Sequence, residues 1–307
     1  MSETGKVLFI GVGRMGNPMA RRLLAAGLSL AVCDLSEQAL EPFRRQGLSV
    51  ARFPAELAGE AVITMLPTDA EVREAVLGER GALSGPHRRA VLIDMSSSAP
   101  GPTRQLGQEL ARAGVAMLDA PVSGGVPRAQ TGELTTMVGG SGEVFERWRP
   151  LLAHMCATIR QVGALGAGDA MKALNNYLSA AAFWASCEAL VIGARAGLDP
   201  AVMVDVWKTG TARSHALEVK IPRAVLPRTF DYGFSLGLMA KDLGIAARLA
   251  RSCDVPAPLL AATEGHLLHA RDALGPQADL TSLITLIERW AGFELPAGAC
   301  ASDKEEK

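Results

Sequence analysis

The feature that most constrains this chain is a glycine pattern set between an apolar run and a helical repeat. Residues 7–10 are all apolar, residues 11–16 read G-V-G-R-M-G, and apolar side chains then recur at every fourth position. A strand, a tight glycine turn and a helix in this order predict a dinucleotide-binding βα unit. In such a unit Gly11 allows the turn, Gly13 admits a pyrophosphate close to the backbone, and Gly16 permits close packing of the helix on the strand.

The start of this helix is the expected binding site of the pyrophosphate. Unpaired backbone N–H groups and the positive end of the helix dipole meet there, and both attract an anion. Arg14 and Met15 lie inside the glycine turn, so we expect them to contact the cofactor as well.

The second apolar run, residues 30–33, leads directly to Asp34, which follows Gly11 by 34 − 11 = 23 residues. A carboxylate at this distance from the glycine turn accepts hydrogen bonds from the adenosine ribose and repels a 2′-phosphate. Residues 35–37 read L-S-E and supply no arginine to bind such a phosphate. The sequence therefore predicts NAD as the cofactor and favours it over NADP.

Short apolar runs continue through the first half of the chain, at residues 62–66, 91–94, 116–119 and 136–138. Their alternation with helix-like stretches predicts a parallel, doubly wound Rossmann sheet over residues 1–164. Ligands of such sheets bind at the carboxyl ends of the strands. The candidate cofactor contacts that follow two of these runs are Leu66, Pro67 and Ser97.

Beyond residue 162 the pattern becomes helical. Residues 169–196 contain no proline and only Gly193 as a breaker, so they predict a helix of about 40 Å that can bridge two domains. We therefore expect an all-helical domain for substrate binding and subunit association over residues 165–298, and a disordered tail over 299–307. Further helices are expected at 201–209, 238–251, 258–273 and 280–290.

The composition argues against several classes of partner. Lys plus Arg number 31 against 32 Asp plus Glu, without a basic cluster, so we expect no nucleic acid partner. The first residues lack the basic segment of a secretion signal, and we expect no membrane partner. The five cysteines are scattered without the spacing of metal ligands or disulfides. We expect free thiols, no metal and a cytoplasmic location.

Two further segments carry candidate chemistry. Residues 119–125 read D-A-P-V-S-G-G, and the Ser123 hydroxyl with the amides of Gly124 and Gly125 can form an anion-binding nest. Lys172 and Asn176 share one face of the predicted long helix. A lysine whose pKa is lowered can take a proton from a hydroxyl group. A plain glycine turn and a solvated lysine remain alternative interpretations.

These segments, together with residues 11–20 and the L-M-A-K-D at 238–242, closely resemble the β-hydroxyacid dehydrogenase family, which includes 3-hydroxyisobutyrate dehydrogenase. The resemblance covers nearly the whole chain. It implies that Lys172 is catalytic with Asn176 in support, and that Lys241 contacts the cofactor. It also implies that four residues bind the substrate: Ser123, Gly124, Gly125 and Phe234.

The resemblance implies an NAD-dependent oxidoreductase that interconverts a small 3-hydroxy acid and its semialdehyde, with Lys172 as general acid and base. His215 replaces an aromatic residue that is common in the hydroxyisobutyrate enzymes, so the acid itself is left open. The alternatives are a reductase of tartronate semialdehyde or another small aldehyde acid, an imine-reducing relative, and a non-catalytic cofactor-binding regulatory protein. Lys172 argues against the last two. We expect a small carboxylate-bearing substrate and a homodimer or homotetramer.

Overall fold

The computed structural model describes residues 6–85 and 90–296. The chain divides into two compact units, Met1–Lys172 and Ala173–Lys307. The division falls inside a single long helix, whereas the sequence places the domain boundary at 164/165, which stays a prediction. The tail expected over 299–307 lies outside the described residues.

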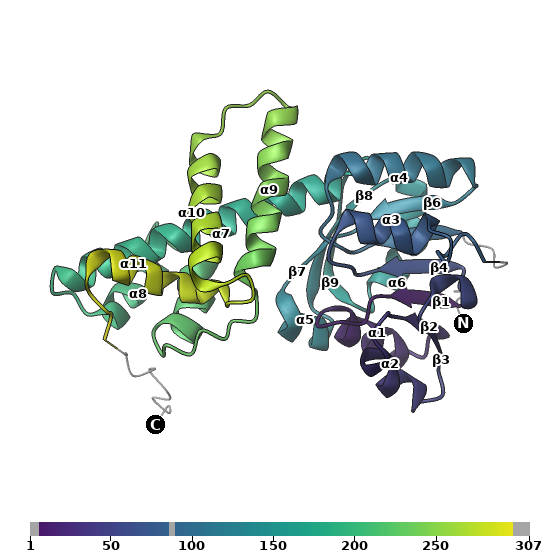
Figure 1. Cartoon of the computed structure of the whole chain (residues 1–307), viewed down its shortest axis with the longest axis horizontal. Helices are drawn as coiled ribbons and strands as arrows, with labels where there is room; N and C mark the ends of the chain where they lie inside the picture. The colour runs from purple at the N-terminus through teal and green to yellow at the C-terminus, as the bar shows by residue number, and fades with distance from the viewer. Residues whose placement is uncertain (1–5, 86–89, 297–307) are drawn as a thin grey trace. The chain divides into compact units, whose positions relative to one another are not determined.

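The first unit is built on a sheet in which six strands run parallel (Figure 1). The Rossmann architecture predicted from the sequence is confirmed. Because the chain crosses to the other side of the first strand after the third, the carboxyl ends of β1 and β4 flank the point where the strand order reverses. In spatial order the parallel strands are β3 (Ser49–Ala51), β2 (Leu30–Cys33), β1 (Val7–Ile10), β4 (Ala61–Thr64), β5 (Val91–Asp94) and β6 (Ala116–Asp119).

The far side of the sheet departs from the all-parallel pattern that the sequence predicts. β8 (Leu134–Gly139) runs antiparallel to β6 and to the short β7 (Val122–Ser123), and it pairs in parallel with β9 (Cys156–Gly163). β9 was not predicted from the sequence because it lies at the surface. Most of its residues are exposed, so its sequence, C-A-T-I-R-Q-V-G, shows no apolar run.

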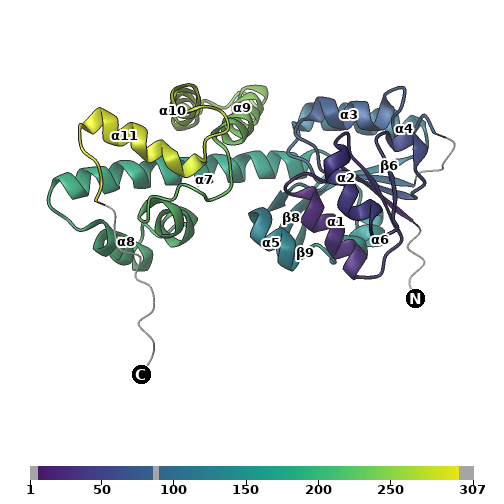
Figure 2. The same cartoon turned by 60° about the horizontal axis from the view of Figure 1, so that its bottom comes forward.

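Helices cover both faces of this sheet, because successive side chains of a buried strand point to opposite sides. Val7 and Phe9 join one core cluster, which includes Met19 of α1 and Phe43 of α2. Leu8 belongs to the other cluster, which includes side chains of α3 and α4. These two helices lie side by side (Figure 2). The helices of the unit are α1 (Gly16–Ala25), α2 (Glu37–Arg44), α3 (Asp69–Leu77), α4 (Pro100–Arg112), α5 (Gly125–Thr131), α6 (Gly142–Leu152) and the 3-10 turn η1 (Pro54–Glu56).

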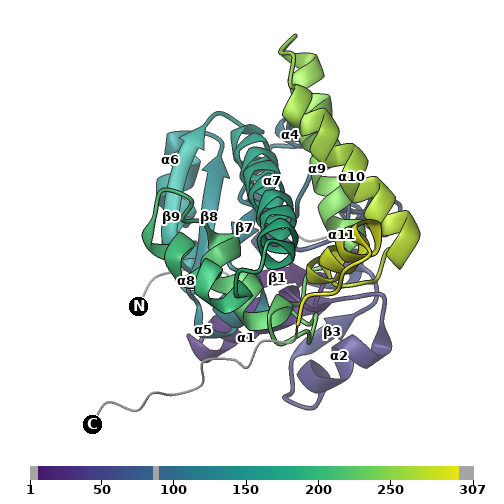
Figure 3. The same ribbon diagram turned by 90° about the vertical axis from the view of Figure 1, so that its left-hand side faces the viewer.

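The second unit is all-helical among its described residues, as the sequence predicts. α9 and α10 run side by side (Figure 3). The second unit contains a π-helix, η2, that the sequence did not predict. The hydrogen bond from the Leu226 N–H to the Ile221 carbonyl oxygen, five residues earlier, has the spacing typical of a π-helix. The elements are α7 (Ala167–Arg195, which begins in the first unit), α8 (Pro200–Thr209), η2 (Ala216–Val225), α9 (Leu236–Ser252), α10 (Pro258–Leu274), η3 (Leu280–Leu283) and α11 (Ile284–Ala291).

The long helix α7 is only partly buried. Only 39% of its most apolar window is buried, and Leu178 and Ile192 are 66% and 70% exposed. By length and composition alone α7 could cross a membrane, a test that core helices of soluble proteins also pass.

Candidate functional site

The glycine turn between β1 and α1 has the geometry that the sequence pattern requires. Gly11 adopts a φ of +91°, and a Cβ on it would overlap the carbonyl oxygen of Met65. A Cβ on Gly16 would overlap the carbonyl oxygen of Gly11, so the helix starts directly against the turn. Among the described residues no heavy atom lies within 4 Å of the position that a Cβ of Gly13 would take. The backbone at Gly13 is therefore open to a ligand.

Asp34 joins this turn to the start of α2. Its Oδ2 accepts a hydrogen bond of 2.8 Å from the Val12 N–H, and its Oδ1 accepts one of 2.8 Å from the Ser36 N–H. Each carboxylate oxygen has a further lone pair, so the group can still accept a hydrogen bond from a ribose hydroxyl. Two hydrogen bonds from backbone N–H groups therefore hold the carboxylate in place beside the glycine turn.

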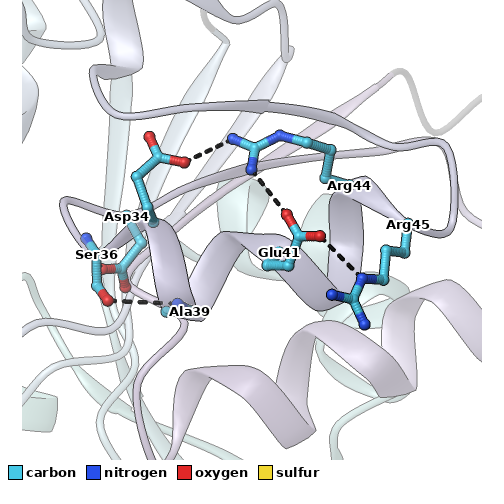
Figure 4. Close-up of polar contacts among 7 residues, drawn as sticks. Asp34, Ser36, Ala39, Glu41, Arg44 and Arg45 are labelled. Carbon is cyan, nitrogen blue, oxygen red and sulfur yellow. Dashed lines mark hydrogen bonds and ion pairs between the residues drawn. The ribbon is translucent and has the colours of Figure 1, made fainter.

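The helix after Asp34, α2, carries two arginines that pair with glutamates of the same helix. Arg44 pairs with Glu37 at 2.8 Å and with Glu41 at 3.1 Å, and Arg45 pairs with Glu41 at 2.8 Å (Figure 4). Exposed ion pairs contribute little free energy. The pairing of Arg44 and Arg45 with glutamates therefore does not by itself keep these arginines from binding a 2′-phosphate. The preference for NAD therefore rests mainly on the Asp34 carboxylate.

Asp94, at the end of β5, organises the loop that contains Ser97. This buried carboxylate accepts hydrogen bonds of 2.8 Å from the hydroxyls of Thr64 and Ser98, and one of 3.0 Å from the Ser96 N–H. The Ser96 hydroxyl in turn accepts the Leu66 N–H at 2.9 Å. The loops after β4 and β5 are thus tied together. Sequence analysis selected Leu66, Pro67 and Ser97 but missed Asp94, although a strand-terminal aspartate beside three serines is a usable signal.

Asp119 ties the 119–125 segment to the first turn of α7. Its Oδ1 accepts the Gly166 N–H at 2.8 Å, and its Oδ2 accepts the Asp169 N–H at 2.9 Å. The Thr103 hydroxyl donates to Asp169 at 2.6 Å. Burial raises the pKa of both carboxyls, and that of Asp169 lies well above its usual range because the carboxylates of Asp119 and Asp94 add to the effect of burial. Sequence analysis did not single out this pair.

The 119–125 segment ends in two glycines that adopt conformations which other residues rarely do. Gly124 has a φ of +136° and Gly125 a φ of +68°, and both are exposed. Ser123, half-buried, precedes them at the end of β7. The hydroxyl and the following backbone amides are therefore presented at the surface of the first unit, where they can bind an anion.

Lys172 and Asn176 both lie on α7, four residues apart, as the sequence predicts. Asn176 is buried and donates from Nδ2 to Oδ2 of Asp242 at 2.6 Å, while Lys241 Nζ lies 3.4 Å from Oδ1 of the same carboxylate. Asp242 belongs to the L-M-A-K-D segment of the resemblance, but its contact with Asn176 was not predicted, since only folding brings α7 and α9 together.

The site residues divide between the units. The first unit holds the glycine turn, Asp34, the loops after β4 and β5, the 119–125 segment and Lys172. The second unit holds Asn176, Phe234 and Lys241. Half-buried Phe234 precedes α9, and its carbonyl oxygen accepts the Leu280 N–H at 2.7 Å. Across residues 6–85 and 90–296, no cluster of three His, Cys, Asp or Glu side chains is arranged to hold a metal.

Comparisons with known proteins cover almost the whole chain. The family model described as the NAD binding domain of 6-phosphogluconate dehydrogenase matches residues 6–163. The model described as NAD-binding of NADP-dependent 3-hydroxyisobutyrate dehydrogenase matches residues 166–287. Together they account for both units.

Individual relatives agree with these matches. The chain is 35% identical to the 2-(hydroxymethyl)glutarate dehydrogenase of Eubacterium barkeri, over 97% of this chain and 100% of that one. It is 37% identical to the 3-hydroxyisobutyrate dehydrogenase of Pseudomonas aeruginosa, over 89% and 93%. Among solved structures, the Mycobacterium tuberculosis 3-hydroxyisobutyrate dehydrogenase with L-serine has a TM-score of 0.84 and 31% identity, covering 92% of this chain and 99% of that chain.

Proposed function

The chain belongs to the β-hydroxyacid dehydrogenase family and is an NAD(P)-dependent hydroxyacid dehydrogenase. We propose that it interconverts a small 3-hydroxy acid and its semialdehyde, with Lys172 as general acid and base. The observation that carries this proposal is the position of Lys172 on the first turns of α7, a helix whose N-terminus is fixed by Asp119. The same carboxylate begins the 119–125 segment. The proton-transfer residue and the candidate carboxylate-binding segment therefore share one anchor.

NAD, when bound, supplies the hydride acceptor. The glycine turn fits this group, because Gly13 leaves the backbone open while Gly11 and Gly16 draw the turn against the sheet. Asp34 would hold the adenosine ribose and disfavour a 2′-phosphate. The further cofactor contacts we propose are Arg14, Met15, Leu66, Pro67, Ser97 and Lys241.

The chain's own residues must remove the hydroxyl proton as the hydride leaves. The neutral amine of Lys172 accepts that proton at Nζ during oxidation and returns it during reduction. Asn176 is the supporting polar group, and its amide is held by the buried carboxylate of Asp242. Ser123 and the amides of Gly124 and Gly125 are the proposed contacts of the substrate carboxylate in the first unit, and Phe234 is a proposed substrate contact in the second unit.

The second candidate is a reductase that acts on tartronate semialdehyde or another small aldehyde acid. The same residues serve both directions, because the group that accepts the hydroxyl proton during oxidation donates it during reduction. A regulatory protein without catalysis would have no need of Lys172 and Asn176. Their presence on one helix face favours an enzyme.

The test is a panel of acids assayed with both cofactors. We expect the chain to reduce NAD in the presence of one or more of 3-hydroxyisobutyrate, L-serine and 2-(hydroxymethyl)glutarate, with the aldehyde trapped and identified as the product. NADP in parallel should give a lower kcat/KM. If NAD binds but none of these acids is oxidised and no aldehyde acid is reduced, the proposed reaction is wrong.

A further inference from the structure

A buried lysine lies outside the machinery described so far. Lys220, in the π-helix η2, is only 3% exposed. Removing an ammonium group from water is costly, and lysines are rarely fully buried unless they are paired. π-Helical segments are themselves rare and occur often at functional sites. The second unit therefore holds the side chain of Lys220 in its interior, on an element of a kind that often occurs at functional sites.

The surroundings of Lys220 suit a cation. Its Nζ donates a hydrogen bond of 2.7 Å to the Ser179 hydroxyl on α7. The same atom lies 5.3 Å from the ring centroid of Phe183 and 5.8 Å from that of Tyr232, distances at which aromatic rings stabilise an ammonium group. The guanidinium of Arg223 also lies 5.8 Å from the Tyr232 centroid. Two positive groups thus gather around one ring, which favours an anion nearby.

The ammonium group lies close to the supporting residue of the proposed reaction. Asn176, Ser179 and Phe183 follow one another at intervals of three and four along α7, so they share one face. Residues at this spacing have Cβ atoms about 5–6 Å apart. Lys220 is hydrogen-bonded to Ser179, which is the residue that follows Asn176 on this face of α7. A substrate that contacts Asn176 can extend a short side arm to Lys220.

We propose that Lys220 binds a second carboxylate of the substrate, so that the preferred substrates are 3-hydroxy acids with two carboxylates. The inference rests on the proposed function, since it assigns the substrate class of that same site. A carboxylate arm would accept a charge-assisted hydrogen bond from Nζ in a region shielded from water, where such bonds are strong.

Three acids that differ only in one arm test the proposal. 3-Hydroxyisobutyrate carries a methyl group, 2-(hydroxymethyl)pentanoate a propyl group, and 2-(hydroxymethyl)glutarate a propionate. The pentanoate matches the glutarate in size but lacks the second charge. We expect the wild-type protein to use the glutarate with a kcat/KM about 10- to 100-fold above that of the pentanoate, the range of one hydrogen bond to a charged group.

The variant Lys220→Met keeps the apolar stem and removes the charge. It should abolish this preference through a higher KM for the glutarate, and leave kcat/KM for the two monocarboxylates within about threefold. Lys220→Arg retains a cation and should restore part of the preference. If Lys220→Met does not fold, as judged by its thermal unfolding, Lys220→Gln provides the same comparison.

Two outcomes would overturn the proposal. Equal losses of kcat/KM on all three acids would show that Lys220 only supports the fold, and a wild-type protein that does not prefer the glutarate would show that no second anion is bound. If no hydroxy acid is oxidised, the proposed function fails separately. Calorimetric binding of 2-methylglutarate and 2-methylpentanoate to the NAD-loaded protein then still decides the role of Lys220, because tighter binding of the dicarboxylate must depend on the lysine.

Discussion

The side-chain amide of Asn176 donates to the buried carboxylate of Asp242 at 2.6 Å, and this bond joins α7 to α9. The Oδ1 atom of Asn176 accepts the Asn175 amide at 3.1 Å, so the Asn176 amide is held on both of its polar atoms. A group held in this way presents one orientation to a substrate. The carboxylate of Asp242 is thus a positioning group that acts through Asn176.

Asp242→Ala should therefore affect both stability and activity. It leaves the Asn176 amide buried without its acceptor, which costs about 1–3 kcal/mol of the free energy of unfolding. We expect kcat to fall more than KM rises, because the Asn176 amide loses its fixed orientation in the variant. Chemical denaturation and initial rates measure the two effects. The control is Asp205→Ala, on the exposed side of α8, which should stay within about 0.5 kcal/mol of wild type.

The pKa of Asp169 predicts a pH-dependent stability difference. In the unfolded chain this carboxyl ionises near pH 3.9, whereas burial and the carboxylates of Asp119 and Asp94 raise its pKa in the folded protein. The neutral form is therefore favoured by folding, and wild-type stability is lost as the pH rises from about 4 through the raised pKa.

Asp169→Asn does not ionise and still offers an oxygen to the Thr103 hydroxyl. Its free energy of unfolding, relative to wild type, should increase with pH above about 4 and level off above the folded-state pKa. Urea denaturation at a series of pH values gives the difference. A constant difference over that range would mean that Asp169 titrates in the folded protein as it does in the unfolded one.

Cofactor preference should depend on the carboxylate of Asp34. Asp34→Ser removes the charge that repels a 2′-phosphate, so kcat/KM with NADP should rise while kcat/KM with NAD falls. Adding Leu35→Arg, at a position 68% exposed, supplies a cation and should shift the ratio further towards NADP. Initial rates with both cofactors give the ratio. An unchanged ratio in the double variant would locate the selectivity elsewhere in the turn.

We propose that the second unit mediates assembly into a homodimer or homotetramer. Its exposed apolar side chains include Leu178, Ile192, Val202 and Val206, each at least 60% exposed. Light scattering should show an oligomer, and Val202→Glu should weaken it because the new charge would be buried in the interface. Leu35→Glu, an equally exposed apolar position in the first unit, should leave the oligomer intact. A monomeric wild-type protein would contradict the proposal.

The sequence was most informative where local rules determine the structure. The strand, turn and helix around Gly11 followed from spacing alone, because only a glycine tolerates the φ of +91° at that position. β9 and η2 were missed for different reasons. The strand lies at the surface and shows no apolar run, and the π-helix depends on contacts of the folded second unit that no local pattern encodes.

The candidate site shows the same division between local and long-range information. The family resemblance selected Ser123, Lys172 and Asn176, and the structure places the first on β7 and the other two on α7. The resemblance did not reveal that Asp242 meets Asn176 across a separation of 66 residues, or that Lys220 is buried, because both depend on how the helices pack. Partners of buried polar groups are set by tertiary structure, so a single sequence cannot reveal them.

The most direct test of the account is the rate of NAD reduction by Lys172→Ala with the best acid of the panel, with and without an added primary amine. General base catalysis contributes about 10²–10⁴-fold, so the variant should lose at least that much of kcat, and small amines should restore activity in proportion to their concentration. Lys208→Ala, on α8, is the matched control. If Lys172→Ala retains a kcat within about threefold of wild type, Lys172 is not the group that takes the proton.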